Sequence, residues 1–375
     1  MHRYTRSEFD GERHPMKAIT VEPKRAGTTR LEDVAEPDAG DGSVLVEAIA
    51  VGVCGTDAEI VEGKYGWAPR GKTRLVLGHE SLGRVVDPGP SGRLKTGDLV
   101  VGIVRRPDPV PCPNCAVGEW DMCRNGQYTE RGIKEIDGFM SERWRIEPEY
   151  AMKVDPSLGL YGVLLEPTTV VTKAWEQVVA VGQRAFWEPR TVLVTGAGPI
   201  GLLAALVGKQ YGLEVHVLDR VESGLKPELV RALGATYHSG SVADIGFAPD
   251  VIVECTGVGQ VIADSIQAIA PGGVVCLTGV GSGGRTIGLA TADVAANMVL
   301  RNTRRRRQRQ RQQTALVQGR RGAGPGGPRV AGAAGDTTRA AGGILRALTA
   351  AAPTMSRLWS SSLMCDRNEA KAIQD

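Results

Sequence analysis

One pattern in the chain constrains its fold more than any other: Gly196, Gly198 and Gly201 form a G-x-G-x-x-G sequence. It directly follows a short β-branched run at 191–195 and opens a helix-like stretch at 199–211. In that position the first glycine permits a tight turn, the second lets a pyrophosphate approach the backbone, and the third lets the helix pack closely on the strand. The six-residue pattern is a weak signal by itself, but the strand before it and the helix after it predict a dinucleotide-binding fold.

Strand-like and helix-like segments alternate through the region that contains this turn. Short apolar runs predict strands, and longer runs with helical periodicity predict helices between them. This repetition predicts a parallel, doubly wound sheet in an α/β domain. The predicted strands are 191–195, 214–218, 251–254 and 274–278, and the predicted helices are 199–211, 227–233 and 260–269.

The first half of the chain has a different pattern. Short β-runs broken by Gly, Pro and Asp are typical of a β-rich domain with long functional loops, and a helix-like stretch at 163–181 leads into the second half. The predicted β-runs are 43–53, 75–77, 83–86 and 98–104. We divide the chain into a disordered extension at 1–15, a β-rich domain at 16–165, a dinucleotide-binding domain at 166–303 and an aberrant, disordered basic tail at 304–375.

Charge is distributed unevenly along the 375 residues, whose net charge is +3. Residues 1–300 carry 30 Lys and Arg against 38 Asp and Glu, whereas residues 301–375 carry 15 against 4. A mildly acidic body argues against a nucleic-acid binder. No run approaches the ~18 apolar residues of a membrane span, and the polar N-terminal residues do not form a secretory signal. The seven cysteines, three of them close together, fit metal sites in the reducing cytoplasm better than a disulfide framework.

Residues around the glycine turn predict how a dinucleotide is held. Pro199 and Ile200 begin a helix whose N-terminus stabilises phosphate charge. Asp219 ends the next predicted strand, where a carboxylate accepts hydrogen bonds from ribose hydroxyls and repels a 2′-phosphate, whereas Arg220 could pair with that phosphate. We therefore predict NAD, with NADP tolerated. The predicted coenzyme-binding residues are Gly196, Gly198, Pro199, Ile200, Gly201, Asp219, Arg220, Leu277, Thr278 and Gly279.

The β-rich half contains the ligand types of a catalytic metal site. Cys54 opens a Cys-Gly-Thr-Asp sequence, His79 and Glu80 follow 25 residues later in Gly-His-Glu, and Glu166 lies in Leu-Glu-Pro. A thiolate, an imidazole and a carboxylate are ligands of zinc sites that keep an open position for substrate. An isolated Cys or His is more often a core or surface residue, but these motifs occur together with the dinucleotide fingerprint.

At these residues the chain resembles the zinc-dependent medium-chain dehydrogenases, and among them the archaeal glucose dehydrogenase branch. The resemblance covers residues 16–303 and is carried by 16–19, 52–57, 77–80, 130–133 (E-R-G-I) and 165–167. It implies a GroES-like β-rich catalytic domain that is followed by a Rossmann domain. It also implies a homo-oligomer, a dimer or a tetramer, with a small-molecule substrate and with no nucleic-acid or membrane partner.

The resemblance also implies residue roles. Catalytic zinc is bound by Cys54, His79 and Glu166, with Glu80 able to exchange in; Thr56 contacts the reacting hydroxyl and relays its proton; Glu130 and Glu166 contact the sugar. The implied reaction is the oxidation of D-glucose, or a related aldose, at C1 to the lactone. Zinc lowers the pKa of the hydroxyl, and hydride passes to NAD(P). A zinc-dependent polyol or alcohol dehydrogenase is the alternative.

Three cysteines form part of a second metal motif. Cys112, Cys115 and Cys123 have the spacing C-x2-C-x7-C, whereas the family's structural zinc lobe has a fourth cysteine, whose place is taken here by Pro109. Asp108, Glu119 or Asp121 could supply the fourth ligand that structural zinc requires. A lobe that folds without metal is the alternative.

The tail does not fit the resemblance. Its Arg- and Gln-rich run at 304–311 could bind nucleic acid, but it lacks aromatic residues for stacking. We favour translation out of frame, because back-translating 307–316 and moving one base along gives G-S-V-N-A-N-R-R-H-Y, and a G-S-V-N-A segment contacts the nicotinamide in the resembled family. The same shift through 318–339 yields an amphipathic helix. A chain that ends in this way would be a weakly active or inactive remnant.

Overall fold

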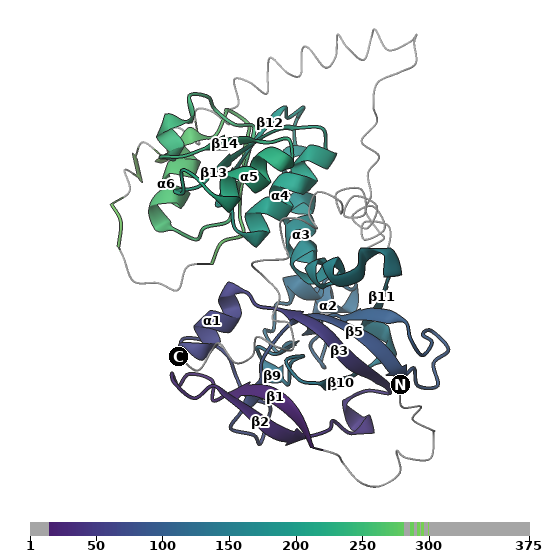
Figure 1. Ribbon diagram of the computed structural model, residues 1–375. Helices are drawn as coiled ribbons and strands as arrows, with labels where there is room; N and C mark the ends of the chain where they lie inside the picture. Colours follow the sequence, from purple (N-terminus) through teal and green to yellow (C-terminus); the bar gives the residue numbers. More distant parts are fainter. Residues whose placement is uncertain (1–14, 281–285, 289–290, 293, 296–298, 300–375) are drawn as a thin grey trace, which may run out of the picture. The chain divides into compact units, whose positions relative to one another are not determined.

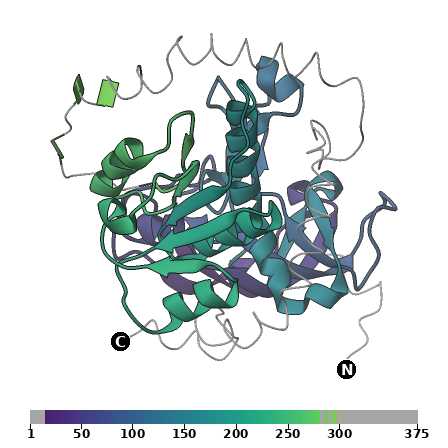
Figure 2. The ribbon, with the colours of Figure 1, turned by 90° about the horizontal axis from the view of Figure 1, so that it is seen from above.

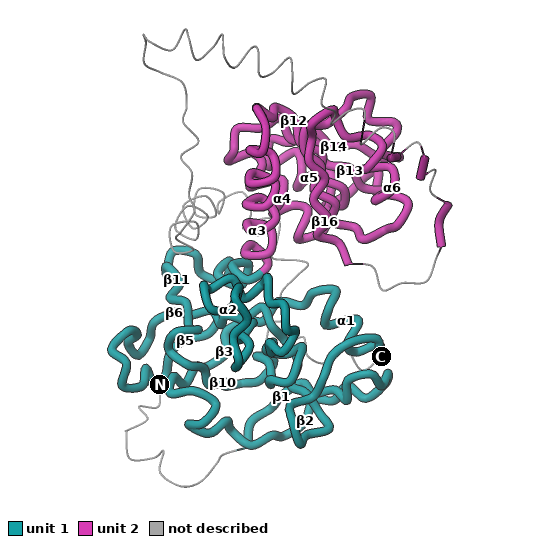
Figure 3. Tube along the Cα trace, turned by 180° about the vertical axis from the view of Figure 1, so that it is seen from behind, with its two compact units in different colours: residues 1–166, 348–375 teal, residues 167–347 magenta. Residues whose placement is uncertain are grey.

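The computed structural model describes residues 15–280, 286–288, 291–292, 294–295 and 299 (Figure 1). The chain forms two compact units that divide between Glu166 and Pro167, coloured separately in Figure 3. The basic tail predicted at 304–375 lies outside the described residues, and so does the extension predicted at 1–15, except for Pro15, which is the first residue of a strand.

Unit 1 is built from short, mostly antiparallel strands. Its largest sheet has five strands in the order β10-β3-β5-β6-β11, and two three-stranded sheets have the orders β2-β1-β4 and β7-β8-β9. The strands are β1 Pro15–Val21, β2 Arg30–Ala35, β3 Val44–Gly52, β4 Leu75–Val76, β5 Glu80–Asp87, β6 Leu99–Gly102, β7 Arg105–Arg106, β8 Thr129–Arg131, β9 Glu135–Ile136, β10 Arg143–Ile146 and β11 Ala151–Val154. Helices α1 Gly55–Val61 and α2 Pro113–Ala116 lie in this unit, with 3-10 turns at Ala39–Asp41, Trp120–Met122, Pro148–Tyr150 and Pro156–Leu164.

One core cluster of unit 1 packs against the five-stranded sheet. Val46, Val85 and Val100 are fully or almost fully buried there, and they pack in one cluster with Phe139 and Trp144. The two aromatic rings meet edge to face with centroids 4.7 Å apart. Because aromatic and branched side chains bury large apolar areas, this cluster stabilises strands β3 and β5, which Cys54 follows and His79 precedes.

Unit 2 contains a five-stranded sheet with the order β14-β13-β12-β15-β16, and every neighbouring pair in it is parallel. Its strands, coloured teal to green in Figures 1 and 2, are β12 Thr191–Thr195, β13 Glu214–Leu218, β14 Thr236–His238, β15 Val251–Glu254 and β16 Val274–Leu277. Its helices are α3 Leu165–Gly182, whose first two residues belong to unit 1, α4 Pro199–Gln210, α5 Leu225–Ala232 and α6 Gly259–Ala268, and a 3-10 turn covers Val242–Ile245. Val192, Leu193 and Val194 are fully buried, as expected for a parallel strand covered on both faces.

The predicted parallel, doubly wound α/β sheet is confirmed. Three predicted strands, at 191–195, 214–218 and 251–254, have the observed bounds of β12, β13 and β15. Strands β2 and β14 were not predicted, because their residues are largely exposed or half-buried and lack a strong apolar pattern. In the described residues, no helix is long and apolar enough to span a membrane.

Candidate catalytic metal site and coenzyme site

Cys54 is held at the N-terminus of helix α1. It is the N-cap residue, and its sulfur accepts a hydrogen bond from the backbone N–H of Thr56 at 3.3 Å. Asp57 lies three residues later, and its carboxylate oxygen accepts a hydrogen bond from the N–H of Cys54 at 3.0 Å. The two hydrogen bonds together form a capping box. The Cys-Gly-Thr-Asp sequence therefore fixes the thiol by local helix capping, and Thr56 lies half-buried beside it.

His79 is placed by a close crossing of two backbone segments. Residues 138–140 hydrogen-bond to 76–78, with Phe139 N–H donating to the Gly78 carbonyl at 2.9 Å. A Cβ atom on either Gly132 or Gly138 would lie 2.3 Å from that same carbonyl oxygen, so only glycine allows the approach. The ligand-bearing turn before β5 is thus positioned by backbone contact.

The predicted ligands converge in unit 1. Cys54 Sγ lies 3.0 Å from His79 Nε2, and Asp57 Oδ1 lies 3.4 Å from His79 Nδ1. Ligand atoms of His79, Glu80 and Glu166 also lie within 4.8 Å of one another. Asp57, to which we gave no role from sequence, faces the second ring nitrogen of His79, as residues that orient metal-bound histidines commonly do.

The electrostatics of this cluster suit a cation. Burial and the nearby Glu166 raise the pKa of Glu80 to about 7, and burial likewise raises the pKa of Glu166. Burial acts to lower the pKa of His79, but Asp57 and Cys54 outweigh it and raise that pKa well above its usual value. Asp57 Oδ1 and His79 Nδ1 are buried without a well-aligned hydrogen bond. A thiol, an imidazole and crowded carboxylates fit Zn²⁺, which would displace their protons.

Glu130 lies on β8 and is held by an arginine. Arg105 donates to Glu130 Oε1 from Nε at 3.0 Å and from Nη2 at 2.8 Å. The charge of Glu130 also acts to raise the pKa of Glu166, so Glu130 lies within electrostatic range of the metal cluster. Arg105 was not identified from the sequence, because nothing local links it to a residue 25 positions away.

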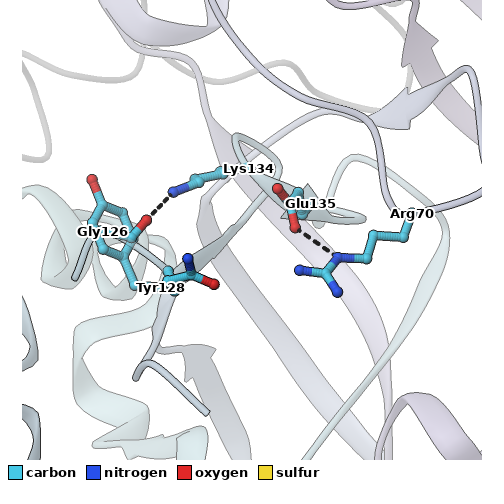
Figure 4. Close-up of a pocket in the computed structure, with 6 residues that line it drawn as sticks. Arg70, Gly126, Tyr128, Lys134 and Glu135 are labelled. Carbon is cyan, nitrogen blue, oxygen red and sulfur yellow. Dashed lines mark hydrogen bonds and ion pairs between the residues drawn. The ribbon is translucent and has the colours of Figure 1, made fainter. Parts of the chain in front are cut away.

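A small polar pocket lies beside the parallel strands β8 and β9 (Figure 4). Its volume is about 240 Å³, below the ~300 Å³ from which most ligand pockets begin. Arg70 is paired with Glu135 at 3.3 Å, and Lys134 donates to the Gly126 carbonyl at 2.7 Å. Since both cations already have partners, this pocket is not the candidate site.

The glycine turn has the geometry that the pattern predicts. Gly196 has φ +92°, and a Cβ at Gly201 would lie 1.8 Å from the Gly196 carbonyl oxygen. A Cβ at Gly198, the N-cap of α4, would meet nothing within 4 Å, and this cap has no side-chain hydrogen bond. Pro199 and Ile200 form the first turn of α4, and a helix N-terminus beside open space suits a pyrophosphate.

Asp219 follows β13 and is tied to the glycine turn. Its Oδ2 accepts from the Ala197 N–H at 2.7 Å and from Lys226 Nζ at 2.8 Å. Burial acts to raise the pKa of Asp219, but the hydrogen bonds from Lys226 and Ala197 outweigh it and lower that pKa. Arg220 is exposed, and its backbone N–H donates to Asp219 Oδ1 at 2.8 Å. Lys226 was missed because it lies on the following helix.

Leu277, Thr278 and Gly279 lie at the same edge of the sheet. The N–H groups of Thr278 and Gly279 donate to the Glu254 carbonyl at 2.8 and 3.0 Å, while Leu277 is half-exposed at the end of β16. The Glu254 carboxylate is fully buried and accepts from the Thr256 and Gly257 N–H groups at 2.7 and 3.1 Å. Glu254, which the sequence did not single out, thus shapes the loop beside the glycine turn.

The three lobe cysteines come together. The sulfur atoms of Cys112, Cys115 and Cys123 lie within 4.8 Å of one another, and in the described chain no carboxylate joins this cluster. The Arg124 N–H donates to Cys112 and is the largest influence that lowers the pKa of that thiol to about 6. Asp108 is buried and one of its carboxylate oxygens has no hydrogen-bond partner.

Two families match most of the chain. The family described as "Alcohol dehydrogenase GroES-like domain" matches residues 40–156, and "Glucose dehydrogenase C-terminus" matches residues 159–304. A glucose 1-dehydrogenase of Methanocella arvoryzae is 40% identical over 295 residues, covering 76% of this chain and 82% of that protein. Glucose 1-dehydrogenase 2 of Vulcanisaeta moutnovskia is 42% identical over 292 residues, covering 76% and 82%.

Solved structures agree with these relatives. Haloferax mediterranei glucose dehydrogenase in complex with NADP, Zn and gluconolactone has a TM-score of 0.70 and 33% identity, covering 77% of this chain and 83% of that one. Galactitol-1-phosphate dehydrogenase from Escherichia coli, at 24% identity and a TM-score of 0.62, covers 76% and 80% and shows only a shared fold. With both halves matched and the predicted ligands brought together, the chain belongs to the glucose dehydrogenase family of zinc-dependent medium-chain dehydrogenases.

Proposed function

We propose that this protein oxidises D-glucose, or a related aldose, at C1 to the lactone with NAD(P) as hydride acceptor. The observation that carries the proposal is the convergence of Cys54, His79, Glu80 and Glu166 in a unit that also holds Glu130. Relatives that are 40–42% identical are glucose 1-dehydrogenases, and a similar solved structure holds NADP, Zn and gluconolactone. A polyol or alcohol dehydrogenase is supported only by the shared fold.

The residues divide the work between binding and proton transfer. Cys54, His79 and Glu166 would hold zinc, with Glu80 able to exchange in, and bound zinc supplies a Lewis acid for the C1 oxygen. Thr56, half-buried beside Cys54, would carry the hydroxyl proton outward while the C1 hydride leaves for the nicotinamide. Glu130 and Glu166 would accept hydrogen bonds from sugar hydroxyls.

Reduction of NAD and NADP by glucose, followed by the absorbance of the reduced nicotinamide, tests this proposal. The zinc-loaded protein should turn over aldoses and not simple alcohols. Glu130→Gln should reduce glucose turnover at unchanged zinc content, because the variant keeps the ligands and loses a charged acceptor. A protein with a restored reading frame after residue 303 is measured beside the chain as written. If both bind zinc and coenzyme but oxidise only alcohols, the aldose assignment is wrong.

We propose a second, structural zinc at Cys112, Cys115 and Cys123. The three thiols cluster, and the lowered pKa of the Cys112 thiol favours the thiolate that binds metal. Asp108, Glu119 and Asp121 remain the candidates for the fourth ligand. A zinc-to-protein ratio of two, falling to one in Cys115→Ser, would support the second site. A ratio of one in the unaltered protein would show that the lobe folds without metal.

We propose that the enzyme acts in the cytoplasm as a dimer or a tetramer, as the family resemblance implies. Sedimentation of the purified protein measures the assembly, and a monomer over the whole concentration range would contradict it.

A further inference from the structure

A lysine side chain lies where the ribose of a bound coenzyme is expected. Lys226 is on helix α5, and its Nζ lies 2.8 Å from Asp219 Oδ2. Asp219 follows β13 and is the carboxylate to which the fold assigns the ribose hydroxyls. The ammonium of Lys226 is therefore within hydrogen-bond reach of the group that would read the 2′ position.

The contacts of Asp219 distinguish Lys226 from Arg220. Arg220 meets Asp219 through its backbone N–H at 2.8 Å, and the Arg220 residue is exposed. The Lys226 side chain is 41% exposed and the Asp219 side chain 10% exposed, so their pair is partly withdrawn from solvent. Such a pair is screened less than a surface pair, and its charge-assisted hydrogen bond is correspondingly strong.

This pairing changes what the carboxylate does to a 2′-phosphate. An unpaired aspartate repels the phosphate, whereas the ion pair of an aspartate and an ammonium has no net charge. The remaining donor positions of the ammonium, which has three in all, stay available to phosphate oxygens. The Tyr237 hydroxyl donates to the Val221 carbonyl, which fastens the loop between Asp219 and Lys226.

We propose that Lys226 determines the coenzyme selectivity of this enzyme, neutralising Asp219 and donating to the 2′-phosphate so that NADP binds as well as NAD. This inference rests on the proposed function only in that it requires a coenzyme at the glycine turn. It requires neither zinc nor sugar turnover.

Calorimetric titration of the full chain with two fragments isolates this subsite. Adenosine 2′,5′-bisphosphate carries the 2′-phosphate, and 5′-AMP lacks it. Lys226→Ala should weaken the binding of adenosine 2′,5′-bisphosphate by ~10-fold or more, the loss typical of a hydrogen bond to a charged group. It should change the affinity for 5′-AMP by less than ~3-fold. Lys226→Arg keeps the positive charge and should retain both affinities within ~3-fold.

Lys153→Ala is the matched control, because Lys153 pairs with Asp98 at 2.7 Å in unit 1 with similar exposed fractions. It should leave both titrations unchanged. Equal losses for the two fragments in Lys226→Ala, or no loss, would overturn the inference while the proposed function stands. If the unaltered chain binds neither fragment, both the inference and the coenzyme part of the proposed function fail.

Discussion

Gly201→Ala should destabilise the protein before any coenzyme is added. The new methyl group would lie 1.8 Å from the Gly196 oxygen and 2.9 Å from its carbonyl carbon. Ordinary contact needs ~3.4 Å, so helix α4 and the turn must separate by about 1.6 Å, and overpacking of this kind costs ~1–3 kcal/mol. The Gly196 N–H donates to the Leu218 carbonyl at 2.7 Å, which ties the turn to β13 and limits its relaxation.

That cost appears as a lower melting temperature. Since each kcal/mol shifts Tm by ~2–4 °C in a domain of this size, circular dichroism of the coenzyme-free protein should show a fall of about 2–12 °C. Gly198→Ala is the matched control, because its Cβ would meet nothing within 4 Å. Its stability should change by less than ~1 kcal/mol, the difference between Gly and Ala as N-cap residues.

Gly198→Ala, the variant with the smaller effect on stability, should impair coenzyme binding. In Gly198→Ala the methyl group occupies the side from which the pyrophosphate approaches, so NAD affinity should fall by ~10-fold or more although the fold is intact. A Gly201→Ala protein with the same melting temperature as the wild type would refute the reasoning, because it would mean that the turn and helix α4 separate without a loss of stability. So would normal NAD binding by Gly198→Ala.

Three other outcomes are expected. Asp57→Asn, which weakens the partner of His79 Nδ1, should lower zinc affinity by ~10–100-fold in competition with a chelator, and unchanged affinity would mean that Asp57 only caps α1. Burial acts to raise the pKa of Glu147, but Arg106 outweighs it and lowers that pKa, so the stability from this pair is present above pH 4.5 and is lost as the pH falls below it. Urea titrations should therefore show a smaller acid loss in Glu147→Gln than in the wild type, and parallel curves would contradict this. Resequencing codons 300–310 should reveal a missing or extra base that restores G-S-V-N-A, and an intact written frame would leave the basic tail as the true sequence.

The parts of the fold predicted best are those determined by local sequence. β12, β13 and β15 are short apolar runs buried by helices on both faces, so their composition alone marks them. By contrast, β8 and β9 are two short strands of polar and half-buried residues. Their pairing depends on neighbours distant in sequence, and no periodicity indicates it.

The candidate site shows the same division. The types and spacing of Cys54, His79 and Glu166 predict a metal site because zinc chemistry restricts its ligands to few residue types. The partners that hold the functional groups were not predicted. Arg105 reaches Glu130 across a β7–β8 pairing, and Lys226 reaches Asp219 from the next helix. Cations of this kind are common on any surface, and only the fold selects the ones that matter.

The glycine crossing beneath His79 has a consequence for how this enzyme could change its substrate. Gly132 and Gly138 press against the Gly78 carbonyl by backbone alone, so the position of the His79 backbone depends little on the identity of neighbouring side chains. Laboratory evolution of sugar specificity can therefore randomise Glu130 while the backbone of the metal ligand stays in place. The glycines themselves should accept no replacement, and libraries that include them would consist largely of proteins without metal.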